Sequence, residues 1–239
     1  KRQVKEGRET LTARTQDFKM RPEQQAAVEK TQRYFHQFKR DNPGKPPRFL
    51  WNAKMRFGKT FTSYEFAKAE GYSRILILTF KPAVADSWRE DLESHKDFER
   101  WQFISRDTEL TYDKADKNEP IVCFGSFQDF LGKNDIGGIK AKNEWVHEIN
   151  WDLVIFDEYH FGAWRDTARE LFEAEDDKER KDNLNSVAEI VGEGFAQGDD
   201  DFLPITTSGY LFLSGTPFRA IANGEFIDCL LYTSPSPRD

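Results

Sequence analysis

The chain has 239 residues, of which 32% are charged, and a formal net charge of −7. This length suits one large domain or a domain and a half. The negative charge argues against a generally basic nucleic-acid coat but leaves room for a local basic patch. We expect no membrane partner, because no apolar run approaches the roughly 18 residues of a bilayer span. We also expect no signal peptide, because the charged N-terminus KRQVKEGRET is followed by no apolar core. Two cysteines, Cys123 and Cys229, suggest neither a disulfide framework nor a metal cluster and fit a reducing cytoplasm.

The two ends of the chain differ in character from the part between them. Residues 1–19 are polar and unpatterned, so we expect a linker or the end of a preceding domain. Residues 229–239, CLLYTSPSPRD, resemble one translated reading frame of a transposase adapter from DNA library preparation. We therefore predict a non-native tail there, with a natural tail rich in serine and proline as the alternative. The domain itself is expected over residues 20–228.

Between these ends, helical patterns alternate with short apolar runs. A helix is expected over residues 21–38, where Pro22 suits the first turn and apolar side chains form a ragged face. Two more helices are expected at residues 60–71, ended by Gly71, and at residues 82–95. The apolar runs are RFLWN (48–52), RILILTF (74–80), PIVCFGSF (120–127), WDLVIFDE (151–158) and GYLFLSGTP (209–217).

None of these apolar runs alternates in hydrophobicity, which is typical of strands buried on both faces. Strand, helix and strand in repetition predict an α/β domain with a mainly parallel central sheet flanked by helices. Right-handed crossovers place the carboxyl ends of the strands at one edge of the sheet, where ligands bind. Residues 163–201 interrupt the alternation of strands and helices with a long acidic segment of helical pattern. We expect a solvated surface insertion there, and a partner-docking element is the alternative.

The stretch AKMRFGKT fits the phosphate-loop pattern A-x-x-x-x-G-K-T between a predicted strand and a predicted helix. In such a loop, amide N–H groups converge on the phosphates and the helix N-terminus adds a favourable dipole. Gly58 lets the backbone approach, Lys59 supplies a positive charge, and Thr60 supplies a hydroxyl to Mg²⁺. The loop residues predicted to bind the cofactor are Ala53, Lys54, Met55, Arg56, Phe57, Gly58, Lys59 and Thr60.

A second motif, LVIFDEYH, ends a predicted central strand with two adjacent carboxylates. Asp157 at the strand end can hold the water shell of Mg²⁺. Glu158 beside it can orient and deprotonate an attacking water. Together with Lys59, these two residues form the predicted catalytic set, and the predicted cofactors are ATP and Mg²⁺.

The stretches RPEQ, AKMRFGKT, DEYH and SGTPFR together resemble the motifs of superfamily 2 helicases and translocases of the DEAD/DEAH-like type. The resemblance covers residues 20–228 and is nearest to the type III restriction enzyme helicase subunit and the UvrB-type group. It implies the first, RecA-like motor domain of such a protein. It also implies that Gln24 reads adenine, and that His160, Ser214 and Thr216 couple hydrolysis to movement.

Arg56 departs from the pattern of this family, which usually has glycine at that position. Glycine tolerates a positive φ angle, whereas arginine is strained there. Either the loop follows a variant path with a negative φ angle, or Arg56 is mildly strained and its guanidinium reaches phosphate or a nearby carboxylate. In both cases we expect nucleotide binding to survive, because the rest of the motif is intact.

The resemblance further implies partners: a nucleic acid, expected to be DNA, a second RecA-like domain outside this chain, and a nuclease or modification subunit. The isolated chain is then expected to bind ATP·Mg²⁺ and to hydrolyse it slowly. The alternatives are a chromatin-remodeller-like translocase on double-stranded DNA, an RNA helicase, a small-molecule kinase with a phosphate loop, and a non-catalytic module. The residues expected to contact nucleic acid are Thr79, Lys81, Ser126 and Gln128.

Overall fold

The computed structural model describes residues 14–53, 56–79, 82–126, 130, 144–157, 205–215 and 230–233, the last four through their backbone. The acidic insertion at residues 163–201 therefore lies outside the described residues. The same holds for several predicted site residues, namely Lys54, Met55, Lys81, Gln128, Glu158, His160 and Thr216.

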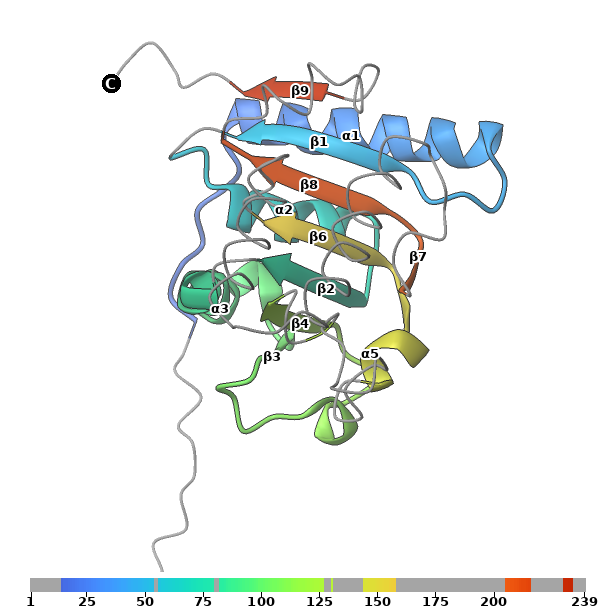
Figure 1. The fold of residues 1–239 in the computed structure, drawn as a ribbon. Coiled ribbons are helices and arrows are strands. Elements are labelled where there is room, and N and C mark those ends of the chain that lie inside the picture. The colour runs from blue at the N-terminus through green and yellow to red at the C-terminus, as the bar shows by residue number, and fades with distance from the viewer. Residues whose placement is uncertain are drawn as a thin grey trace, which may run out of the picture.

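Seven parallel strands form the central sheet, in the order β3-β4-β2-β6-β8-β1-β9 (Figure 1). The predicted parallel α/β class is confirmed, and each of the five apolar runs supplies a strand. The strands are β1 (Arg48–Ala53), β2 (Arg74–Thr79), β3 (Gln102–Ile104), β4 (Ile121–Ser126), β6 (Leu153–Asp157), β8 (Tyr210–Ser214) and β9 (Leu230–Thr233).

Four of the strands were not predicted as separate strands, although Trp151 of one of them lies in the predicted run 151–158. Strand β3 lies at one edge of the sheet, and β9 pairs with β1 at the other edge. The remaining two, β5 (Asn150–Trp151) and β7 (Thr206–Thr207), form a separate two-stranded pair. Strand β9 falls inside the adapter-like stretch, whose non-native origin stays a prediction.

Three helices pack against the sheet: α1 (Pro22–Asp41), α2 (Lys59–Ala69) and α3 (Ala85–Ser94). In Figure 1, α1 and α2 lie behind the strands and α3 lies to the left of them. Helix α1 begins at the predicted proline. Helix α2 ends as expected before Gly71, whose φ angle of 70° suits glycine. The shorter helical elements are η1 (Pro82–Val84), η2 (Lys96–Phe98), η3 (Tyr112–Lys114) and α5 (Glu144–Glu148).

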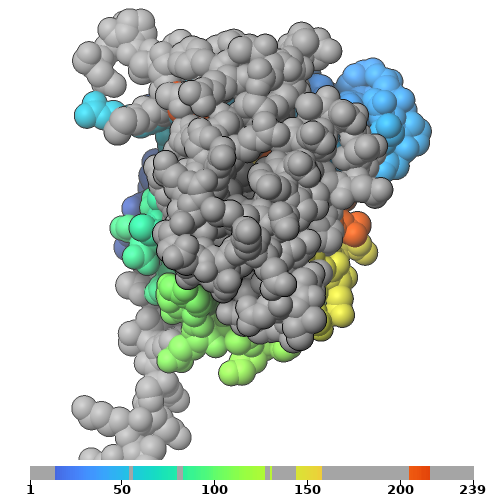
Figure 2. All heavy atoms as spheres, in the orientation of Figure 1, coloured from blue at the N-terminus to red at the C-terminus, as the bar shows by residue number. Residues whose placement is uncertain are grey.

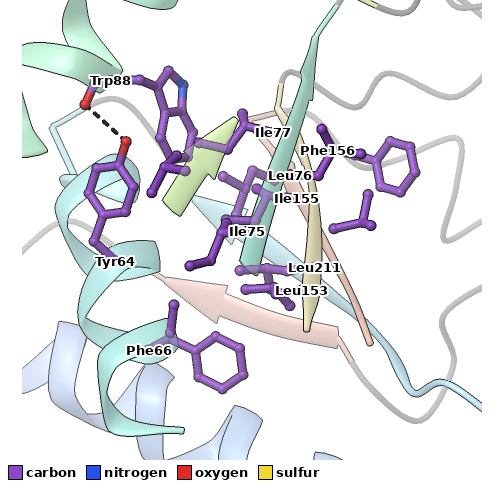
Figure 3. Close-up of a cluster of buried hydrophobic side chains, with 14 of the residues drawn as sticks. Tyr64, Phe66, Ile75, Leu76, Ile77, Trp88, Leu153, Ile155, Phe156 and Leu211 are labelled. Carbon is purple, nitrogen blue, oxygen red and sulfur yellow. Dashed lines mark hydrogen bonds between the residues drawn. The ribbon is translucent and has the colours of Figure 1, made fainter. Parts of the chain in front are cut away.

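The core fills both faces of the central strands. In Figure 3, Tyr64 of α2 and Trp88 of α3 lie on one side of β2 and β6, and Phe156 of β6 lies on the other. The ring of Phe156 stacks on that of Phe212 in β8, with centroids 4.7 Å apart. Burial on both faces explains why the sequence of these strands shows continuous apolar runs instead of alternation.

The segment before α1, for which we expected a linker or the end of a preceding domain, is held against the domain by hydrogen bonds over its described part. The backbone N–H of Lys96 donates to the carbonyl of Gln16 at 2.9 Å. The Nε2 atom of His95 lies 2.9 Å from the carbonyl of Phe18, whose ring also contacts that histidine. Residues 14–19 thus pack on the turn that follows α3.

In the part of the chain that the structure describes, no helix is long and apolar enough to cross a bilayer.

Candidate nucleotide-binding site

Buried polar side chains line the carboxyl edge of the sheet, where the arrowheads of Figure 1 point to the left. Because the strands are parallel, their registers bring these residues together: Thr79 lies opposite both Ser126 and Asp157, and Asn52 lies opposite Ser214. This edge therefore joins residues from five separate sequence segments. They are Asn52, Thr79, Ser126, Asp157 and Ser214, at the ends of β1, β2, β4, β6 and β8.

The loop between β1 and α2 uses two left-handed backbone conformations. Arg56 has a φ angle of 67°, so of the two accounts of this residue, the path with a negative φ angle is wrong. Gly58 has φ 77° and ψ 45° and caps the N-terminus of α2. A Cβ atom on Gly58 would lie 2.8 Å from Nε2 of Gln24, so both its backbone conformation and the available space favour glycine. The loop projects at the left of the space-filling view, in cyan, and Arg56 is exposed (Figure 2).

Two side chains at the start of α1 hold the carbonyl groups of this loop. Arg21 donates through Nη2 to the carbonyls of Arg56 at 2.9 Å and Phe57 at 2.7 Å. Gln24, buried, donates through Nε2 to the carbonyl of Phe57 at 2.8 Å and accepts from the backbone N–H of Arg21 at 2.8 Å. The glutamine therefore fastens the phosphate loop here, while its contact with adenine stays a prediction. The role of Arg21 was not predicted from the sequence, although this arginine is the first residue of the RPEQ motif.

Lys59 and Asp157, far apart in the sequence, meet at the centre of the site. Lys59 is the first residue of α2, and its Nζ atom lies 2.8 Å from Oδ1 of Asp157. The lysine side chain is 25% exposed and the aspartate 1% exposed. The other carboxylate oxygen, Oδ2, accepts a hydrogen bond from Nε1 of Trp88 at 2.8 Å. Asp157 is therefore a buried charge with a specific donor on each oxygen, as a charge at such a position requires.

The residues present fit a nucleotide with Mg²⁺. Helix α2, of 11 residues, presents its N-terminus to the loop, which favours a bound anion. Thr60 lies in the first turn of α2, next to Lys59. Among the described residues, no three His, Cys, Asp or Glu side chains gather as a metal-binding group. Mg²⁺ is usually bound by one or two protein oxygens together with substrate phosphates and water, and Thr60 and Asp157 carry such oxygens.

The predicted nucleic-acid residues are only partly described. Thr79 and Ser126 lie side by side at the ends of β2 and β4, and both side chains are buried. Their contact with nucleic acid stays a prediction. Trp88 of helix α3 is buried in the core at 1% exposure, so its ring is not available to stack on a base.

A parallel α/β sheet with this loop between β1 and α2, and with a carboxylate at the end of β6, is the arrangement of a phosphate-loop nucleotide-binding domain. A family model described as "Type III restriction enzyme, res subunit" matches residues 17–180. The chain therefore belongs to the family of type III restriction enzyme res subunits. The placement in superfamily 2, nearest to the type III restriction enzyme helicase subunit, is thereby confirmed.

Among the known proteins that the chain resembles, one is a "Putative type II restriction enzyme and methyltransferase RM.MpnORF110P C-terminus" from Mycoplasma pneumoniae. It is 38% identical over 218 residues, which cover 86% of this chain and 29% of that protein. A solved structure, the Sulfolobus solfataricus SWI2/SNF2 ATPase core in complex with dsDNA, matches with a TM-score of 0.50 and 14% identity. That match covers 86% of this chain and 34% of the other, and it shows a shared fold. The chain thus spans about a third or less of these relatives.

Proposed function

We propose that this chain is the ATP-binding part of a DNA translocase or helicase that serves a restriction–modification system. The observation that carries the proposal is the contact between Lys59 and Asp157 at the carboxyl edge of the sheet, beside the N-terminus of α2. This contact brings together a lysine, which can bind phosphate, and an aspartate, which can bind a metal ion. The relative named as a restriction enzyme and methyltransferase supports the biological setting.

Different residues of this chain hold the loop, the phosphates and the metal ion. Arg21 and Gln24 hold carbonyl groups of the loop, which leaves its amide groups for the phosphates. Lys59, on a flexible stem, exchanges its contact with Asp157 for one with the phosphates. Thr60 and Asp157 would hold Mg²⁺, Asp157 partly through water; when bound, the ion neutralises phosphate charge.

The hydrolytic step is assigned to Glu158, the residue that follows Asp157 at the end of β6. Its carboxylate would orient the attacking water and accept its proton. A kinase would instead need to activate a hydroxyl group of its substrate. Glu158 lies outside the described residues, so this role rests on the DEYH motif and on the position of its neighbour.

The decisive test is calorimetric titration of ATP with Mg²⁺ into the chain and into Lys59→Ala. We expect the substitution to weaken binding about 100-fold or more, because it removes charge-assisted hydrogen bonds to phosphate. Lys68→Ala is the matched control, since Lys68 lies on the same helix but pairs with Asp97, with Nζ 3.5 Å from Oδ1. Equal affinities of Lys59→Ala and the parent chain would refute the assignment.

Turnover separates the proposed motor from its alternatives. Motors of this family complete the ATP site with arginine fingers from a second RecA-like domain, so the 239-residue chain alone should hydrolyse ATP slowly. A longer version of the protein should be stimulated by DNA. Vigorous DNA-stimulated turnover by the chain alone would contradict the need for a second domain, and stimulation by a small hydroxyl metabolite would favour a kinase.

A further inference from the structure

Trp88 contacts the metal-binding carboxylate from a helix that the catalytic motifs do not include. Its indole Nε1 donates to Oδ2 of Asp157 at 2.8 Å, and both side chains are 1% exposed. Hydrogen bonds to a buried charge are among the stronger ones in proteins. The bond therefore fixes the plane of this carboxylate, and it does so with a neutral donor that adds no charge to the site.

The position of Trp88 is itself fixed by helix α2. The hydroxyl of Tyr64 donates to the carbonyl of Trp88 at 2.9 Å, as the dashed line in Figure 3 shows. The two rings meet edge to face, with centroids 5.4 Å apart. Burial raises the pKa of the Tyr64 hydroxyl, and the negative charges of Asp91 and Asp157 raise it further, so this donor keeps its proton at neutral pH.

The two oxygens of Asp157 have donors of different kinds. The donor to Oδ2 is the rigid, buried indole, whereas the donor to Oδ1 is Lys59, whose side chain is 25% exposed. A lysine on a four-carbon stem can leave, but a packed tryptophan cannot leave without opening the core. We propose that Trp88 is a positioning residue for the metal: it retains Oδ2, so that Oδ1 is the oxygen released to the metal and its water. This inference rests on the proposed function.

The first test compares ADP affinity with and without Mg²⁺ in the parent chain and in Trp88→Phe. The gain in affinity that Mg²⁺ confers should fall about tenfold, while the affinity for metal-free ADP stays within about twofold of the parent value. Trp151→Phe is the matched control, because Trp151 is also 1% exposed and its Nε1 donates to the carbonyl of Val146 at 2.9 Å. This control should leave the gain unchanged.

Two outcomes of that titration overturn the proposal. An unchanged Mg²⁺ gain in Trp88→Phe would show that the indole donor does not act on the metal. If Trp88→Phe weakened ADP binding equally with and without Mg²⁺, the role of Trp88 would be merely structural. A parent chain that bound no ADP at all would instead overturn the proposed function, and this inference with it.

The indole N–H resonances supply a second test that does not depend on the folding of Trp88→Phe. The chain has six tryptophans. In Asp157→Asn, one indole resonance, that of Trp88, should shift strongly while the other five stay in place. In the parent chain the same resonance should keep its hydrogen-bonded position when ADP and Mg²⁺ are added. No shift in Asp157→Asn, or loss of the bonded position on adding nucleotide and metal, would contradict the proposal.

Discussion

Two aspartates lie at the two ends of strand β6, and their partners differ. Asp152, just before the strand, accepts the backbone N–H groups of Ser73 at 2.8 Å and Arg74 at 2.9 Å through Oδ2, and the hydroxyl of Ser73 at 3.3 Å. Asp157, the last residue of the strand, accepts from the side chains of Lys59 and Trp88. Backbone donors in a sheet cannot move, whereas a lysine side chain can. At the amino edge the carboxylate is held by the backbone of the neighbouring strand, whereas at the carboxyl edge it has one fixed donor, Trp88, and one on a flexible stem, Lys59.

The residues around the two aspartates differ in the same way as their direct partners. At the amino edge, the guanidinium of Arg74 donates to the backbone carbonyls of Lys117 and Glu119 and so closes the start of β2 onto a loop. At the carboxyl edge, the neighbours of Asp157 in the sheet include the buried Thr79. Backbone partners predominate at the amino edge and polar side chains at the carboxyl edge, which is the edge where open α/β sheets generally bind ligands.

The largest effect on stability is expected when the amino edge loses its carboxylate. Asp152→Ala leaves two N–H groups at the start of β2 without their acceptor, which should lower the free energy of unfolding by about 1–3 kcal/mol. Denaturant titration measures the change. Binding of ATP per folded molecule should stay at the parent value, because Asp152 lies at the opposite end of the strand. If fully folded Asp152→Ala bound ATP more weakly than the parent chain, the two edges would not have the separate roles assigned to them.

Sequence patterns were sufficient for the central strands and the phosphate loop. Each of the five predicted strands is a continuous apolar run, and buried parallel strands leave that local signal. The Gly58–Lys59–Thr60 loop and the Asp157 strand end are likewise contiguous motifs. Their contact follows once the sheet is parallel, because all carboxyl ends then share an edge.

Contacts made by packing left no such signal. Strand β3 is only three residues long, too short for a recognisable run. The hydrogen bond from Trp88 to Asp157 depends on how α3 lies across β2 and β6, which no local pattern encodes. The contacts of Arg21 with the loop depend in the same way on where α1 begins.

A smaller effect should come from a third carboxylate, Glu65 of α2, which belongs to neither edge. Burial raises its pKa, partly opposed by the positive charge of Lys68, whose Nζ lies 4.0 Å from Oε1. Among the described residues no group donates a hydrogen bond to this buried oxygen. Because the pKa in the folded state is raised, ionisation of Glu65 destabilises the fold as the pH rises through that value.

Glu65→Gln should therefore stabilise the chain at pH 7, by less than about 1 kcal/mol. The gain should disappear below the ordinary glutamate pKa of 4.5, where the parent side chain is protonated in both states. Thermal unfolding of both chains from pH 4 to pH 8 measures the difference. A stability difference that does not change with pH would show that ionisation of Glu65 has no part in it.

The comparison between the two aspartates is tested most directly by ATP affinity with and without Mg²⁺ in Asp157→Asn and Asp152→Asn. We predict that the parent chain and Asp152→Asn bind ATP more tightly when Mg²⁺ is present. Asp157→Asn should lose most of that gain and keep its affinity for metal-free ATP, because Lys59 remains. A full Mg²⁺ gain in Asp157→Asn, or an equal loss in both variants, would contradict the assignment of the carboxyl edge as the metal and nucleotide site.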